Sequence, residues 1–144
     1  MSPAYISATL RRQVRADVGN RCGYCHSPEW LTGMPLEIEH LLPEAAGGLT
    51  IRENLWLACH RCNEYKGARI QAYDPVTEEQ VRLYNPRIQS WRDHFSWSLD
   101  GAEIIGLTPC GRAIVKAWQL NNAYVIEARR FWNVADWHPP VEDM

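Results

Sequence analysis

Two Cys-x-x-Cys pairs constrain this chain more than any other feature of its sequence. The first pair is Cys22 and Cys25, the second is Cys59 and Cys62, and 33 residues separate the pairs. Each short loop presents two sulfurs to one ion, and four thiolates form a tetrahedral zinc site with no open position for a substrate. The pattern therefore predicts a structural zinc site that holds both ends of the intervening segment together.

Two other uses of these residues stay open from the pattern alone. Either pair could act as a redox dithiol, although two pairs around one segment favour a metal. His26 and His60 each follow a cysteine and could replace one sulfur as a ligand. Metal-binding cysteines are typical of a reducing compartment, so we expect a cytoplasmic protein. Cys110, the fifth cysteine, is predicted to be an ordinary buried thiol.

The length of 144 residues suits one domain, or a small domain with an extension. We expect a core at residues 1–72 and an extension at residues 73–144 that packs on it. Seven tryptophans and six tyrosines can supply large buried surfaces. No stretch approaches about 20 apolar residues, and residues 1–10 lack the basic and apolar regions of a secretory signal. We therefore expect no association with a membrane.

A fixed order of polar residues runs through the segment between the cysteine pairs and just beyond it. An acidic residue and a histidine end a first apolar run, two glycines follow, and an asparagine opens a second run. In order, the residues are Glu39, His40, Gly47, Gly48 and Asn54, with Asn63 and Lys66 after the last cysteine. The arrangement resembles the HNH endonuclease family, and several linked motifs are far more specific than any single one.

The resemblance implies an α+β fold with a ββα-metal core, stapled here by the four-cysteine zinc site. The first strand is expected at residues 36–41, the second at 49–57, and the helix from about residue 60 to Gly67. Positive backbone angles are expected at the Gly-Gly turn. A helix is predicted from Ser7 or Thr9 to about Val18, because apolar residues recur there at helical spacing.

The extension after residue 72 is predicted to contain helices and one hairpin. Residues 86–95 are expected to form a helix, and residues 95–106 a hairpin with a two-residue turn at Asp100-Gly101. Two more helices are predicted to begin at Thr108-Pro109 and near Asn122. The last residues are expected to form a tail.

The resemblance also assigns a role to each residue of the motif. Glu39 and Asn63 are expected to hold a catalytic Mg²⁺ or Mn²⁺, because their oxygens are hard ligands. His40 is expected to be the general base that activates water, and Asn54 to brace the loop that orients His40. Two residues depart from the common family pattern: Glu39 stands where aspartate is usual, and Asn63 where histidine is frequent.

A DNA substrate is implied by the same resemblance. The formal net charge of −2 confines any positive surface to a local patch, so binding should be weak and sensitive to salt. The candidate contacts are Arg11, Arg12, Arg15, Arg61, Lys66 and Arg69. Two alternatives stay open: a zinc-dependent module that binds nucleic acid without cutting it, and a nuclease acting on RNA.

Overall fold

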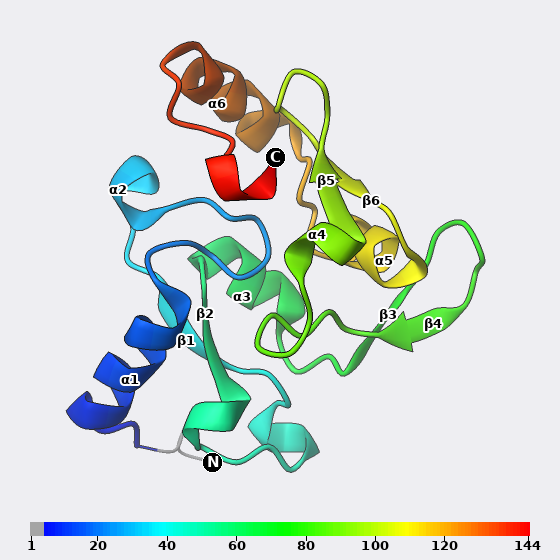
Figure 1. Ribbon diagram of the computed structural model, residues 1–144. Helices are drawn as coiled ribbons and strands as arrows, with labels where there is room; N and C mark the ends of the chain where they lie inside the picture. Colours follow the sequence, from blue (N-terminus) through cyan, green and yellow to red (C-terminus); the bar gives the residue numbers. More distant parts are fainter. Residues whose placement is uncertain (1–4) are drawn as a thin grey trace. The chain divides into compact units, whose positions relative to one another are not determined.

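The chain has an α+β fold divided into two compact units, residues 1–70 and 71–144 (Figure 1). The computed structural model describes residues 5–144. The prediction that no secretory signal is present concerns residues 1–10. Residues 1–4 of this stretch lie outside the described residues. Within residues 5–144, no helix has both the length and the apolar character needed to cross a lipid bilayer.

Two strands and a helix form the centre of the first unit. β1 (Glu37–His40) pairs antiparallel with β2 (Leu55–Ala58), and α3 (His60–Lys66) follows β2 and contacts both strands. α1 (Ala8–Val18) contacts β2 and contributes the fully buried Val14. The predicted order of two strands and a helix is confirmed. The second strand begins at Leu55 rather than residue 49, because a single 3-10 turn, η2 (Arg52–Asn54), precedes it.

Local side-chain chemistry explains where the helices of this unit begin and end. Ser7 Oγ accepts a hydrogen bond from the Leu10 amide at 3.1 Å, which caps α1 as predicted. Gly19 and Gly67 follow α1 and α3 with φ angles of 87° and 51°, which glycine adopts without a steric penalty. The segment between the first cysteine pair and β1 contains one helical turn, α2 (Glu29–Thr32).

The loop from β1 to β2 is clamped by Asn54. Its Oδ1 accepts from the Leu42 amide at 2.8 Å, and its Nδ2 donates to the carbonyls of Leu42 and Leu49 at 3.0 and 2.9 Å. Within the loop, η1 (Glu44–Ala46) ends at Gly47, whose φ is 91°. Three hydrogen bonds from one side chain therefore hold both ends of the loop that follows His40.

Gly48 is required for a different reason from Gly47. The predicted positive φ is confirmed at Gly47, but Gly48 does not have one. A Cβ at Gly48 would instead lie 1.7 Å from the Leu42 carbonyl oxygen and 2.9 Å from Asn54 Nδ2. The second glycine of the turn is therefore set by close packing of the clamped loop.

We expect Gly48→Ala to destabilise the fold more than Gly47→Ala. At Gly47 an alanine has open space and only strains the backbone, by about 1–2 kcal/mol. At Gly48 the new methyl group forces the backbone of Leu42 to move, and such overpacking costs up to about 3 kcal/mol. Urea unfolding of both variants measures the difference. Equal losses would show that space at Gly48 is not limiting.

The second unit consists of two hairpins and two longer helices. The antiparallel hairpins are β3 (Gln71–Tyr73) with β4 (Gln80–Arg82), and β5 (Phe95–Trp97) with β6 (Ile104–Gly106). The helices are α5 (Pro109–Ala117) and α6 (Ala123–Val134). Thr108 and Asn122 cap them through their side-chain oxygens, as predicted.

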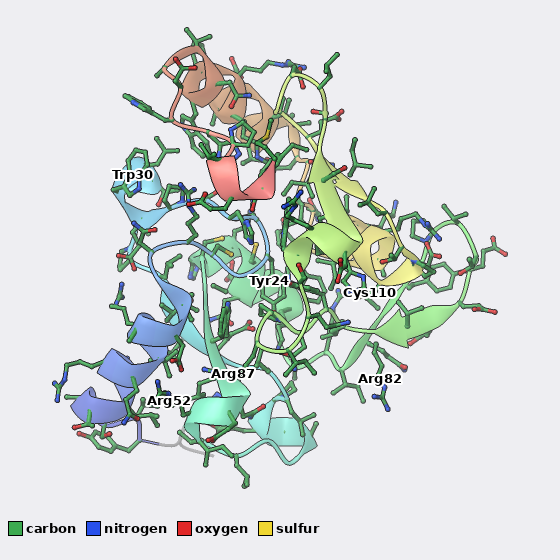
Figure 2. The ribbon with its side chains drawn as sticks, viewed as in Figure 1. Tyr24, Trp30, Arg52, Arg82, Arg87 and Cys110 are labelled. Atoms are coloured by element: carbon green, nitrogen blue, oxygen red, sulfur yellow. The ribbon has the colours of Figure 1, made fainter. Side chains whose placement is uncertain are left out.

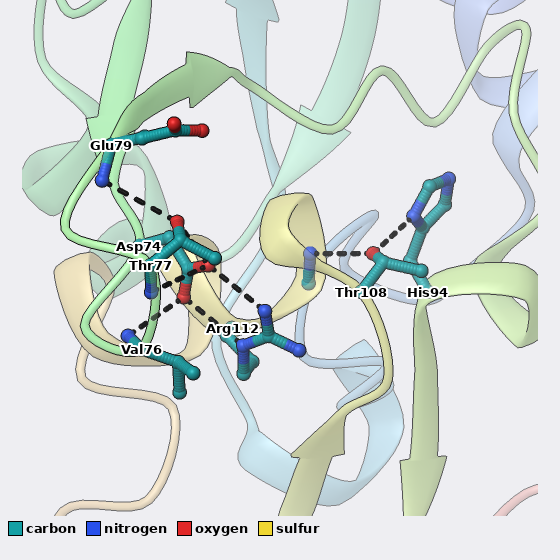
Figure 3. Close-up of polar contacts among 8 residues, drawn as sticks. Asp74, Val76, Thr77, Glu79, His94, Thr108 and Arg112 are labelled. Atoms are coloured by element: carbon teal, nitrogen blue, oxygen red, sulfur yellow. Dashed lines mark hydrogen bonds and ion pairs between the residues drawn. The ribbon is translucent and has the colours of Figure 1, made fainter.

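Buried polar contacts connect the elements of this unit (Figure 3). Arg112 of α5 donates to both oxygens of Asp74 at 3.0 and 2.9 Å, and it holds the pKa of that carboxyl well below its usual range. Thr108 Oγ1, which accepts from the Gly111 amide, lies 2.7 Å from His94 Nδ1. These contacts tie α5 to the β3–β4 loop and to α4 (Trp91–His94).

Two predictions for the extension were wrong, and one hairpin and a short terminal turn were not predicted. The helix expected at residues 86–95 is only α4, because Asn85 accepts hydrogen bonds from the amides of Arg87 and Gln89 and forms a turn instead. The β5–β6 loop spans Ser98–Glu103 rather than two residues. The β3–β4 hairpin was not predicted. The expected tail forms η3 (Val141–Asp143), where Asp143 accepts from Trp97 Nε1 at 3.1 Å.

Candidate active site and metal centre

The four cysteines of the two pairs gather into one cluster. Their sulfurs all lie within 4.8 Å of one another, and Cys25 Sγ is 3.8 Å from Cys59 Sγ. A tetrahedral zinc site with Zn–S bonds of about 2.3 Å places its sulfurs roughly 3.8 Å apart. The sulfur set therefore fits one zinc ion, and among the described residues neither His26 nor His60 belongs to the cluster.

Hydrogen bonding within the cluster makes one thiol the easiest to ionise. Contacts from Cys22, Cys59 and Cys62 lower the pKa of Cys25 well below its usual value. Burial raises the pKa of Cys22. Binding of a cation would favour the thiolate form at all four positions, because a metal ligand must be deprotonated.

We expect the purified protein to contain about one zinc per chain, and the first unit to unfold when the zinc is removed. The physical reason is that strands of four residues cannot stabilise themselves. Elemental analysis and circular dichroism during chelation test both points. Cys110→Ser is the control, because Cys110 lies outside the cluster, at the start of α5 (Figure 2). A metal-free protein that stays fully folded would contradict the prediction.

Glu39 is the buried residue of β1, although its side chain is acidic. Its side chain is only 3% exposed, whereas Ile38 is half-buried. Oε1 accepts a hydrogen bond from the hydroxyl of Tyr24, which lies inside the first cysteine pair (Figure 2). Oε2 is buried and has no hydrogen-bond partner among residues 5–144. Burial raises the pKa of Glu39 to about 7, although the charge of Lys66 and the Tyr24 hydroxyl oppose this shift.

His40 follows Glu39 at the end of β1, and only one of its ring nitrogens is held. Nε2 lies 2.9 Å from Thr50 Oγ1 and 3.1 Å from Glu44 Oε1, and the side chain is 16% exposed. A carboxylate only accepts hydrogen bonds, so the contact to Glu44 places the proton on Nε2. Nδ1 has no hydrogen-bond partner in the part of the chain that the structure describes. The neutral ring therefore has a free lone pair on Nδ1.

Asn63, in the first turn of α3, is held by Glu37 of β1. Asn63 Nδ2 donates to Glu37 Oε1 at 2.9 Å, and Glu37 Oε2 lies 2.8 Å from His60 Nδ1. The Asn63 contact and then the His60 contact lower the pKa of Glu37. The amide oxygen of Asn63 has no hydrogen-bond partner within residues 5–144.

Lys66 is buried beneath this site. Its Nζ donates to the backbone carbonyl of His40 at 2.7 Å, and the side chain is 2% exposed. Burial lowers the pKa of Lys66, and the negative charge of Glu39 opposes the shift. The ammonium group therefore supports the end of β1 and places a positive charge near the buried carboxylate.

One cavity of about 400 Å³ brings together the two predicted metal ligands and the predicted base. It lies between the end of β1, the following loop and α3. Its lining includes Glu39, His40, Glu44, Asn63 and Lys66. Asn54 does not line it and instead holds the loop behind His40. The oxygens of Glu39 and Asn63 therefore share one space with the histidine.

The basic residues predicted to contact nucleic acid differ in whether they already pair with an acidic residue. Arg15 pairs with Glu29 at 2.7 Å, and Arg52, another basic residue of this unit, donates twice to Asp17. Arg61 is half-buried, and its Nε has no hydrogen-bond partner in the described residues. Among the described residues, three members of the predicted set are exposed and have no acidic partner: Arg11, Arg12 and Arg69.

The segment that carries this geometry, residues 22–69, matches the family described as HNH endonuclease. These residues belong to the HNH family. In addition, 48 residues of the chain are 48% identical to the CRISPR-associated endonuclease Cas9 of Corynebacterium diphtheriae. That match covers 33% of this chain and 4% of the Cas9 chain. No solved structure gave a significant match.

The HNH segment contains all four cysteines and each predicted residue of the cavity. The partners Tyr24, Glu37 and Glu44 were missed by the sequence analysis. Tyr24 lies within the first Cys-x-x-Cys pair, and Glu37 is two residues before Glu39, on the same face of the strand. The sequence therefore gave a reason to consider both residues. Nothing in the local sequence marks Glu44 as a partner of His40.

Proposed function

We propose that the protein is a metal-dependent HNH endonuclease that hydrolyses phosphodiester bonds of DNA. The observation that carries the proposal is the buried Glu39 oxygen without a partner, in one cavity with His40. An isolated buried carboxylate is costly, and a bound cation compensates its charge. The HNH family match of residues 22–69 supports the same reading.

The donor set of the cavity fits a hard divalent cation. Glu39 Oε2 and Asn63 Oδ1 are oxygen ligands, and two protein ligands leave the remaining positions to water and phosphate, as Mg²⁺ prefers. Bound there, Mg²⁺ or Mn²⁺ would stabilise the negative charge that develops on the leaving 3′-oxygen.

His40 supplies the proton acceptor. Its Nε2–H is held by Glu44 and Thr50, so the lone pair on Nδ1 accepts a proton from the attacking water. Asn54 holds the loop that carries Glu44 and Thr50, which keeps the imidazole in place. A positioned base of this kind contributes about 10²–10⁴-fold to the rate.

A cleavage assay with three substrates tests the proposal. Purified protein is incubated with supercoiled plasmid, single-stranded DNA and structured RNA, each with Mg²⁺, Mn²⁺ or EDTA. Nicked or linear plasmid in the presence of either metal supports a DNA endonuclease. Cleavage of RNA alone would replace the DNA substrate, and binding without any cleavage would identify a non-cutting module.

We expect His40→Ala to lower the cleavage rate at least 10²-fold while the far-UV spectrum and the zinc content stay unchanged. The reason is that His40 lies at the edge of the cavity, outside the zinc cluster. His26→Asn is the matched control, because Asn tolerates the φ of 59° at this position. Near-normal cleavage by His40→Ala would assign the base to another group.

We expect Glu39→Gln and Asn63→Ala to raise the Mn²⁺ concentration needed for half-maximal cleavage, with zinc content unchanged. Glu39→Gln removes the negative charge that attracts the ion, and Asn63→Ala removes an amide oxygen. Both changes leave the cysteines untouched. Glu64→Gln is the control, because Glu64 is exposed and does not line the cavity. Wild-type metal dependence in both variants would place the ion elsewhere.

Acidic pH should weaken the binding of the activating ion to the wild-type protein. Because the pKa of Glu39 is raised to about 7, the carboxylate is increasingly protonated below that pH, and a proton then competes with the cation. The Mn²⁺ requirement should therefore rise about tenfold per pH unit below 7. Saturating Mn²⁺ should overcome this effect, because a bound cation displaces the proton from the carboxylate.

A further inference from the structure

Each of the two residues proposed to hold the activating ion has one polar atom engaged and the other free. Glu39 Oε1 accepts from the Tyr24 hydroxyl, and Glu39 Oε2 has no partner among the described residues. Asn63 Nδ2 donates to Glu37, and its Oδ1 has no partner in the same set. The donor in the Tyr24–Glu39 contact differs from the donor in the Asn63–Glu37 contact. In both cases, however, one side-chain oxygen of the proposed ligand remains available.

This arrangement restricts how the two side chains can act as ligands. A carboxylate with both oxygens free can bind one ion through either or both of them, and an amide can turn by 180° about its terminal bond. The Tyr24 contact removes the first freedom from Glu39. The Glu37 contact removes the second from Asn63, because only the NH₂ group can donate to a carboxylate.

We propose that Tyr24 and Glu37 are positioning residues that orient Glu39 and Asn63 for a divalent cation. The inference rests on the proposed function in one respect: it takes from it the position of the cation at Glu39 and Asn63. Tyr24 lies between Cys22 and Cys25, so it links the zinc cluster directly to the buried carboxylate. Glu37 lies on β1 and accepts a hydrogen bond from the Asn63 amide on α3. The amide is therefore oriented only when these two elements pack together.

The test is direct measurement of Mn²⁺ binding by electron paramagnetic resonance, without any nucleic acid. Residues that orient a metal ligand typically change the affinity 10–100-fold when they are replaced. We expect Tyr24→Phe to raise the Mn²⁺ dissociation constant about tenfold while zinc content stays at one per chain. Tyr73→Phe, an exposed tyrosine of the second unit, is the control.

Variants at Glu37 separate orientation from charge. Glu37→Ala should weaken Mn²⁺ binding, whereas Glu37→Gln should keep most of it, because the glutamine oxygen still accepts from Asn63 Nδ2. Equal weakening by both would mean that Glu37 acts only through its charge. Glu64→Ala removes one nearby charge without touching Asn63 and serves as the control.

The outcomes separate this inference from the proposed activity. Weaker Mn²⁺ binding in Tyr24→Phe and Glu37→Ala supports it even if the wild-type protein cuts no substrate. Wild-type Mn²⁺ affinity in both variants overturns it even if the protein is an active nuclease. If Tyr24→Phe loses its zinc, the two Glu37 variants decide, because Glu37 is partly exposed and lies outside the cysteine cluster.

Discussion

The convergence of four thiols is the constraint on which the first unit depends. Cys22 and Cys25 lie in the turn between α1 and α2, whereas Cys59 and Cys62 lie where β2 passes into α3. The two strands have four residues each, and an isolated pair of this size is marginal in water. The cluster therefore replaces part of the apolar core that so small a unit lacks, and it aligns the strands with the helix that carries Asn63.

The buried carboxylate of Glu39 works against the stability of the fold. Glu39 occupies the most buried position of β1, where an apolar side chain would favour folding. Its raised pKa reflects this cost, because burial disfavours the charged form. The hydroxyl of Tyr24 and the ammonium group of Lys66 reduce the cost without removing it. A conflict between local burial and residue type is expected at a functional site.

Much of the fold was predictable because its signals are local. The caps at Ser7, Thr108 and Asn122 lie within three residues of the amides they accept from, and the helices begin there. The same locality explains the errors in the extension. The turn at Asn85 replaced a helix whose apolar spacing looked adequate. The loop of the β3–β4 hairpin is also tied to α5 by the pair of Asp74 and Arg112, which lie 38 positions apart in the chain.

For the site, the sequence by itself determined the cysteine spacing, the order of the motif and therefore the HNH assignment of residues 22–69. Only the tertiary structure decided which atoms of Glu39, His40 and Asn63 are free. Tyr24 and Glu39 are 15 positions apart, and Glu37 and Asn63 are 26 apart. The physical reason is that a side-chain hydrogen bond forms wherever packing brings a donor to an acceptor, and local sequence preferences do not specify that distance.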